Sequence, residues 1–344
     1  MFDLVYILDD AYWIPVTVSA KSALTCLKRP ESRIRFWLIA DGVSEAHREV
    51  LRRELVTKRS EVIFVTPALS AFEGLPAWHG TKLVWTRCVL NELLPDLHAW
   101  VCICDGDTLW LKSPEDLFAL AARAKPETVV LGSRTLSPDP DYFCMGFALM
   151  HFDRMCAFGT KEKCLEHLNA RPVPAFLEQD VLNEIWRDCR ELLPRGWGVS
   201  PVCGLEQLTP EEIACVHYWG ELPWPAKWYR RLRDVNVLWW HLMRDLMRLP
   251  TDDARFRMSG WTYCLMRTAN FLFPLFRACG LLSGCKPGAK LPLRPMLREM
   301  DERWSAFVRA RAKGRRTSCG LLLRLQERWS AARCGVAGRP SGRV

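Results

Sequence analysis

Residues 99–110 read AWVCICDGDTLW, and this stretch decides the fold class. Its first half, Ala99 to Cys104, has little polar content, which is typical of a strand in the middle of a parallel sheet. The strand stops at Asp105-Gly106-Asp107. In open α/β sheets, ligands bind outside the carboxyl ends of such strands. The sequence therefore predicts an α/β protein with a ligand site at this position.

The segments on either side alternate between strand and helix. Before this stretch, strands are predicted at 3–8, 33–39 and 62–65, and helices at 15–27, 44–55 and 81–94. After it, Ser113-Pro114 predicts the start of a helix, followed by strands at 128–131 and 146–150 and a helix at 179–189. This rhythm is typical of a sheet with crossover helices.

Composition and charge indicate a globular body and a basic tail. Of the 344 residues, 49% are hydrophobic and 25% charged, which excludes a largely disordered chain. The net charge of +9 is uneven, because residues 286–344 carry 15 Lys/Arg against 4 Asp/Glu, a net +11, whereas the rest carries −2. Such a tail favours a polyanion, either an anionic lipid surface or a nucleic acid.

The cysteines and the N-terminus predict a cytoplasmic protein. The 15 cysteines lie scattered in apolar runs without a CxxC pair, so a zinc ribbon or a disulfide framework is not expected. The opening MFDLVYILDD lacks the basic flank of a signal peptide. No uninterrupted run of 18 apolar residues predicts a membrane span.

Three side chains stand out as metal ligands. Asp105 and Asp107 can both reach one hard cation such as Mn²⁺ or Mg²⁺, although Asp-Gly is also a common turn sequence. His217 follows another apolar run, and an imidazole beside carboxylates suits Mn²⁺. Taken alone, this histidine is more typical of a hydrogen-bonded, half-buried residue than of a metal ligand.

Other polar groups leave two interpretations open. The acids after the first strand could bind a ribose or base edge, or could end the strand. The acids at the start of the later helix could complement its dipole or face a sugar. The arginine at position 87 could be a solvated charge or could pair with an anionic substrate. The residues concerned are Asp9, Asp10, Glu178, Gln179, Asp180 and Arg87.

Five segments, in this order and over residues 1 to 228, resemble family 8 of the glycosyltransferases. The resemblance is greatest to the bacterial galactosyl- and glucosyltransferases that build lipopolysaccharide. The segments are Ile7-Leu8-Asp9-Asp10-Ala11-Tyr12, Arg87 with Leu93-Leu94-Pro95-Asp96, Cys104-Asp105-Gly106-Asp107-Thr108-Leu109-Trp110, Gln179-Asp180-Val181-Leu182-Asn183, and His217-Tyr218-Trp219-Gly220 with Pro223-Trp224.

The resemblance implies a Rossmann-like nucleotide-diphospho-sugar transferase fold of the GT-A type in residues 1–250, and the pattern and charge of the sequence beyond it predict a helical basic region in 251–344. It implies retaining transfer of galactose or glucose from a UDP-sugar to a hydroxyl of a glycan or lipid-linked acceptor. The metal, Mn²⁺ or Mg²⁺, would be held by Asp105, Asp107 and His217. The remaining implied site residues are Ile7, Asp9, Asp10, Arg87, Asp105, Gly220 and Lys227 for the donor, and Gln179, Glu178 and Asp180 for catalysis at the transferred sugar.

The chain departs from the family pattern at three positions. Cys144 stands where an Asn is usual, as does Ala11, and Leu222 replaces a lysine, for which Lys227 could substitute. These departures keep two alternatives open. One is a non-catalytic nucleotide-sugar or glycan-binding protein with the same fold, and the other is a metal-assisted nucleotidyltransferase.

The basic tail predicts two amphipathic helices, at 296–313 and 321–332. Each carries one tryptophan, Trp304 or Trp329, among leucines and arginines. This composition favours a segment lying in an anionic membrane interface on the cytoplasmic face, with a solvated helical hairpin as the alternative. No nucleic-acid-binding module is recognisable, so a nucleic-acid partner is not expected.

Overall fold

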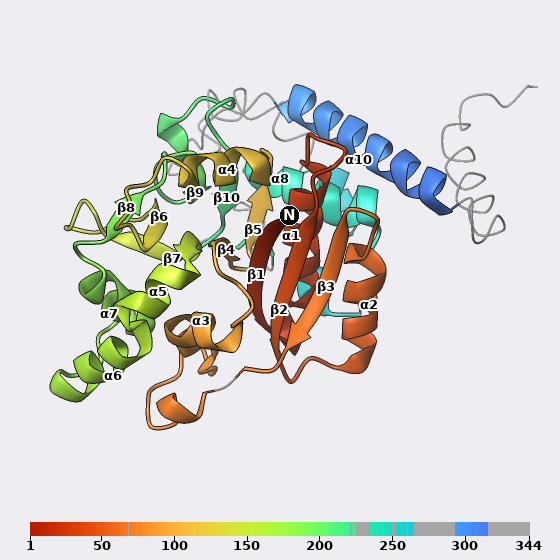
Figure 1. Cartoon of the computed structure of the whole chain (residues 1–344). Helices are drawn as coiled ribbons and strands as arrows, with labels where there is room; N and C mark the ends of the chain where they lie inside the picture. The colour runs from red at the N-terminus through yellow and green to blue at the C-terminus, as the bar shows by residue number, and fades with distance from the viewer. Residues whose placement is uncertain are drawn as a thin grey trace, which may run out of the picture.

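The computed structural model describes residues 1–67, 69–220, 222–224, 234–249, 252–259, 261–264 and 293–315. Within them, a seven-stranded sheet has the strand order β3-β2-β1-β4-β7-β6-β8 (Figure 1). The predicted α/β class is confirmed. The strands of this sheet are β1 (Phe2–Asp9), β2 (Ile34–Asp41), β3 (Ser60–Val65), β4 (Trp100–Cys104), β6 (Val130–Arg134), β7 (Phe143–His151) and β8 (Arg190–Leu192).

The central place of β4 in the sheet agrees with its apolar sequence. It pairs in parallel with β1, which continues in parallel to β2 and β3. On its other side it pairs with β7 in the antiparallel direction, and β7 is antiparallel to β6 as well. The strand β7 begins at Phe143, three residues before the predicted strand, and so carries backbone up to the end of β4.

Several predicted helices are present, although the one predicted at 179–189 is α7, which ends at Ile185. Ser44 and Ser113 cap α2 and α4 as expected. The helix predicted at 81–94 is mainly the 3₁₀-helix η3 (Leu83–Val89), because Val84, Thr86 and Val89 are β-branched and disfavour an α-helix. Helices α5 and α6 carry too weak an apolar stripe to be predicted. The α-helices are α1 (Trp13–Thr25), α2 (Glu45–Leu55), α3 (Leu90–Leu93), α4 (Pro114–Ala121), α5 (Phe152–Phe158), α6 (Thr160–Ala170), α7 (Leu177–Ile185), α8 (Asp234–Trp240) and α10 (Leu293–Arg315).

Both faces of the sheet are covered by a hydrophobic core. Leu4 and Tyr6 of β1 point into the core shared with α1, α2, α4 and α8. Val5, between them, points into the core shared with η3, α3, α5 and α7. Alternate residues of a strand face opposite sides of its sheet, so a strand covered on both sides is apolar throughout. This explains why β1 and β4 read as continuous apolar runs.

A second, three-stranded sheet lies beside the end of β4. It consists of β5 (Thr108–Trp110), β10 (Cys215–His217) and β9 (Trp197–Val199), in that order. Strand β10 is antiparallel to β5, and His217 pairs with Thr108. These three-residue strands are too short to produce a periodic pattern, and the sequence did not predict them. Their pairing nevertheless sets the geometry of the site.

The first predicted tail helix is present as α10, which contacts α1, α8 and the π-helix η6 (His241–Met247) (Figure 1). Leu293 and Leu297 are buried there, and Trp304 packs against the same core. Part of the apolar side of this helix is therefore used within the protein, and its association with a membrane stays a prediction. The second predicted helix and Trp329 lie outside the described residues. The domain boundary at residue 250 stays a prediction.

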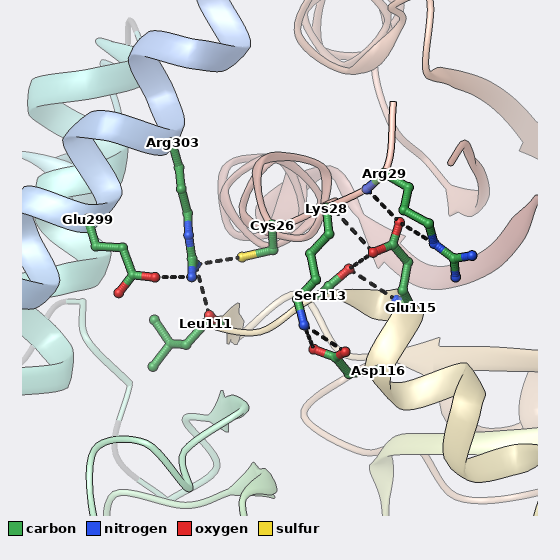
Figure 2. A network of polar contacts seen from close by, with 9 residues as sticks. All are labelled: Cys26, Lys28, Arg29, Leu111, Ser113, Glu115, Asp116, Glu299 and Arg303. Carbon is green, nitrogen blue, oxygen red and sulfur yellow. Dashed lines mark hydrogen bonds and ion pairs between the residues drawn. The ribbon is translucent and has the colours of Figure 1, made fainter. Parts of the chain in front are cut away.

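Polar contacts fix α10 to the segment that follows β5 (Figure 2). Nη1 of Arg303 donates a hydrogen bond to the carbonyl oxygen of Leu111, at 2.8 Å. Nearby, the Glu115 carboxylate accepts hydrogen bonds from the backbone N–H groups of Lys28 and Arg29, each at 3.1 Å. The ends of α1, β5 and α4 are thereby joined. Among the helices of the described residues, none has the length and apolar content needed to cross a membrane.

Candidate functional site

The Asp105-Gly106-Asp107 segment connects the two sheets, between β4 and β5. The backbone N–H of Asp105 donates to the carbonyl oxygen of Gly146 on β7, at 2.8 Å, so the first acid is held like a strand residue. Gly106 lies against the start of α1, where an added Cβ would be 2.9 Å from Val16 Cγ2. The close approach to the helix requires glycine and fixes both flanking acids.

His217 completes a group of three metal-ligand side chains. Its Nε2 lies 3.4 Å from Oδ1 of Asp107 and 3.7 Å from Oδ2 of Asp105. One ligand atom from each of the three residues lies within 4.8 Å of the other two, so the group could hold one metal ion. The imidazole is buried, which would lower its pKa, but the Asp107 carboxylate and the neighbouring Cys144 together outweigh burial and hold the pKa of His217 well above its ordinary value.

The surroundings of this triad fit a divalent ion. A Cβ built on Gly146 would lie 2.1 Å from Cε1 of His217 and 2.5 Å from Oδ2 of Asp105, so only glycine leaves room for both ligands. Two carboxylates and an imidazole form a mixed oxygen and nitrogen set that suits Mn²⁺. Asp105 keeps 31% of its side chain exposed, whereas His217 keeps 3%, so access to the triad is from the side of Asp105.

A buried arginine links the triad to α7. Nη1 of Arg87 lies 2.5 Å from Oε1 of Glu178, and its Nη2 hydrogen-bonds to Oδ1 of Asp105. Burial lowers the pKa of Arg87, but the carboxylates of Asp105 and Glu178 more than offset this, so the pKa is raised and the guanidinium stays charged. Arg87 is therefore not a solvated charge, and it orients one acid of the triad.

The first turn of α7 is fixed to the start of β7 by its polar side chains. Oε1 of Gln179 accepts a hydrogen bond from the N–H of Met145 at 3.0 Å, and its Nε2 donates to the hydroxyl of Tyr142 at 3.1 Å. The same hydroxyl donates to Asp180. Leu177 starts the helix with a φ of 46°, a left-handed conformation that costs a non-glycine residue about 1–3 kcal/mol. The turn is thus held in one orientation.

The residues predicted near the nucleotide lie at the end of β1. Oδ1 of Asp9 accepts a hydrogen bond from the N–H of Ala11 at 2.9 Å. Oδ1 of Asp10 accepts one from the N–H of Ser44 at 2.9 Å and lies 2.6 Å from Nδ1 of His47, so this acid also anchors α2.

Two further donor-site predictions are placed by the structure, and one is not. Ile7 is half-buried in the second core. Gly220 has a φ of 77° and is exposed in the turn that follows β10. Lys227 lies outside the described residues. The structure therefore brings Asp105, Asp107 and His217 together with Arg87 and Glu178.

Sequence reasoning missed three residues of the site. Gly146 and Tyr142 could have been found only by knowing that β7 runs beside β4. Arg255, from the short helix η7 (Ala254–Phe256), donates from Nη2 to the carbonyl oxygen of Ala11 at 3.0 Å. It is 244 positions away in the chain, and no local pattern marked it.

Comparison with known proteins agrees with this geometry. The family model described as Glycosyl transferase family 8 matches residues 3–227. The fold is that of a GT-A type glycosyltransferase. The chain belongs to glycosyltransferase family 8. No curated protein sequence matches it.

Several solved structures share the fold at low sequence identity. The galactosyltransferase LgtC, crystallised with donor and acceptor sugar analogs, is 21% identical, with a TM-score of 0.59 over 73% of this chain and 98% of its own. The glycosyltransferase GlyE of Streptococcus pneumoniae TIGR4 is 15% identical, with a TM-score of 0.53 over 80% of this chain and 64% of its own. Mouse xyloside xylosyltransferase 1 is 13% identical, with a TM-score of 0.51 over 64% of this chain and 98% of its own.

Proposed function

We propose that the protein is a retaining hexosyltransferase. It would transfer galactose or glucose from a UDP-sugar to a hydroxyl of a glycan or lipid-linked acceptor, in the synthesis of lipopolysaccharide or another surface polysaccharide. The observation that carries the proposal is the convergence of Asp105, Asp107 and His217 within 4.8 Å in a chain of family 8. The ligands named for LgtC, donor and acceptor sugar analogs, are of the kind proposed here.

In this proposal the triad would hold Mn²⁺ or Mg²⁺. When bound, the ion would stabilise the negative charge of the leaving diphosphate, so that no general acid is needed. Asp9 is proposed to bind the uridine, with Ile7 and the free edge of Asp10 beside it. Gly220 and Lys227 are proposed for the diphosphate, and Arg255, which pairs with Asp253, fixes the backbone at Ala11 after β1.

The contacts of α7 favour a front-face route for retention. A double displacement needs an unencumbered nucleophile on the far face of the sugar. Glu178 is 4% exposed and paired with Arg87, and both ends of the Gln179 amide are hydrogen-bonded. Neither group has the freedom of a nucleophile. We therefore propose that Glu178, Gln179 and Asp180 orient the transferred sugar, while the leaving phosphate guides the acceptor hydroxyl.

The experiment is UDP release from UDP-galactose or UDP-glucose, with and without Mn²⁺. We expect metal-dependent release, and we expect Asp107→Asn to abolish it while the metal-free protein stays folded, because asparagine keeps the shape of this buried side chain beside His217. Asp188→Asn, an exposed acid before β8, is the matched control and should leave release unchanged. A large loss of stability with unaltered donor binding would assign the aspartates a structural role.

One alternative has a specific observation behind it. The Cys144 thiol lies 3.8 Å from Nδ1 of His217, where the family usually has an asparagine. A protein that has kept the fold but lost turnover would bind UDP-hexose with saturation and release no UDP, even with an acceptor. The same assay therefore separates a nucleotide-sugar-binding protein from the proposed enzyme.

A further inference from the structure

A cavity opens beside η6. Its volume is about 920 Å³, within the range of small-molecule sites, and none of the proposed metal ligands lines it. Three arginines, Arg244, Arg248 and Arg257, line it together with apolar side chains that include Met243 and Met258. The cavity therefore combines a cationic wall with a flexible apolar one.

Two of these arginines lack a carboxylate among the described residues. Nη1 of Arg244 is buried without a hydrogen-bond partner there, and its guanidinium lies over the ring of Tyr263 at 4.6 Å. Arg248 is exposed and forms no ion pair with a described residue, whereas Arg257 pairs with Asp252 at 3.3 Å. A buried guanidinium hydrogen without an acceptor is costly, and this one lies in a cavity wall.

Asp245, the acidic residue in the cavity lining, does not neutralise Arg244 and Arg248. Asp245 accepts a hydrogen bond from the hydroxyl of Tyr263 at 2.7 Å, and its Oδ2 lies 3.0 Å from Nδ1 of His241. Nε2 of His241 in turn lies 2.8 Å from Oδ1 of Asp301 on α10. This carboxylate is thus engaged in fixing η6 to α10, and the cavity retains a positive charge from Arg244 and Arg248.

The backbone around the two arginines is irregular. Arg244 lies in a π-helix, a rare conformation that is concentrated at functional sites. Arg248 ends this helix with a φ of 53°, at a position where glycine is the usual residue. A glycine would remove the strain and the charge together. An arginine in this conformation, four residues after another arginine that lines the same cavity, indicates that the charge is needed there.

We propose that this cavity binds a phosphate or diphosphate group carried on an apolar chain. Guanidinium groups bind phosphate through paired, charge-assisted hydrogen bonds, and a phosphate dianion would match the two unneutralised arginines. Methionine side chains adapt to irregular hydrocarbon groups. The link to catalysis rests on the proposed function, because in such a transferase this group would be the phosphate-bearing end of a lipid-linked acceptor. Binding itself does not depend on transfer.

The experiment is a calorimetric titration of the full chain in EDTA with three probes: geranyl diphosphate, inorganic pyrophosphate and geraniol. We expect geranyl diphosphate to bind at least about tenfold more tightly than pyrophosphate, because only the former also buries apolar surface, and geraniol to show no binding. The double variant Arg244→Gln/Arg248→Gln should lose at least about tenfold in affinity. Arg298→Gln, which removes an exposed charge from α10, is the matched control and should bind as the wild type does.

A second variant distinguishes a loss of binding from a loss of folding. Arg248→Gly suits the left-handed backbone, so it should retain the thermal midpoint while weakening geranyl diphosphate binding. Equal binding of pyrophosphate and geranyl diphosphate would overturn the apolar part of the proposal. An unchanged affinity in Arg248→Gly and in the double variant would overturn the site itself.

Two further arms identify the source of the phosphate and separate this inference from the proposed function. The first measurement is competition with geranyl diphosphate by lipid vesicles. If phosphatidylglycerol vesicles compete, phosphatidylcholine vesicles do not, and the double variant loses this competition, the site binds bulk lipid headgroups and the acceptor role is overturned. UDP-hexose affinity, measured with Mn²⁺, should be the same in the wild type and the double variant. If the wild type binds no UDP-hexose but binds geranyl diphosphate through these arginines, the proposed function fails and the cavity inference stands.

Discussion

Replacing Gly146 by alanine should abolish metal binding through steric displacement alone. The new Cβ would lie 2.1 Å from Cε1 of His217 and 2.5 Å from Oδ2 of Asp105. Ordinary van der Waals contact begins at 3.4 Å, so the two distances are too short by about 1.3 Å and 0.9 Å. Strand β7 cannot shift to relieve this clash, because it is paired with β4 on one side and with β6 on the other. The ligands themselves must therefore move by about 1 Å, whereas metal sites tolerate distance errors of about 0.2 Å.

The expected loss of Mn²⁺ affinity is at least about 100-fold, the upper end of what disturbing the groups that orient a metal ligand costs. The assay is Mn²⁺ titration by calorimetry in the presence of UDP, together with urea unfolding of the metal-free protein. Overpacking should also destabilise the variant by about 1–3 kcal/mol, so binding is measured well below the unfolding midpoint.

A matched control separates crowding from ligand displacement. Gly132 lies on the neighbouring strand β6, and an added Cβ there would be 2.4 Å from the Phe143 side chain, not from a metal ligand. Gly132→Ala should lose a similar amount of stability and keep its Mn²⁺ affinity. If folded Gly146→Ala binds Mn²⁺ as tightly as the wild type, the three side chains are not the ligands and the reasoning is refuted.

Three other changes test the supporting structure. Arg87→Met should destabilise the protein by about 3–5 kcal/mol in urea unfolding, because Glu178 is left buried without its partner; an unchanged midpoint would contradict this. The pKa of Asp10 is lowered, because hydrogen bonds to its carboxylate outweigh its burial. The ionised carboxylate therefore contributes to the stability of the fold above its ordinary pKa, and this contribution is lost as the pH falls through the lowered pKa. The stability difference between wild type and Asp10→Asn, followed by urea unfolding from pH 7 to pH 2, should therefore vanish at the acidic end; a constant difference would exclude this origin. A chain ending at residue 315 should keep the thermal midpoint of the full chain. A chain ending at residue 284 should lose at least about 3 kcal/mol of its free energy of unfolding, since it lacks the buried apolar face of α10. Equal midpoints for the two chains would show that α10 is dispensable.

The sequence could predict those parts of the fold that rest on long patterns. The strand β1 and the apolar β4 are marked by continuous apolar runs, and the cap at Ser44 follows from local hydrogen bonding. The antiparallel direction of β7 could not be predicted, because an apolar strand buried on both sides carries no mark of its direction. For the same reason the sequence could not identify Gly146 as a site residue, because its role depends entirely on the ligand side chains that lie beside it, Asp105 after β4 and His217 on β10.

For the tail, composition alone could not decide between two interpretations. Leucines, arginines and a tryptophan on one helix are typical both of a membrane-surface helix and of a helix docked on a domain. The difference lies in what covers the apolar side, and α10 is covered by the protein. Lys21 of α1 illustrates this point, because its Nζ lies 5.0 Å from the Phe307 ring and its side chain is fully buried. No pattern in the sequence connects positions so far apart.

The candidate metal site depends on a register that a three-residue strand sets. His217 reaches the acids because β10 pairs with β5 so that His217 lies opposite Thr108, the residue directly after Asp107. A slip of one residue would turn the imidazole to the opposite face of this small sheet. On its other side β10 has an irregular register with β9 between Cys215 and Val216, so the pairing with β5 fixes the histidine. The site thus joins two sheets through one short strand, and its geometry belongs to the tertiary fold rather than to any motif in the chain.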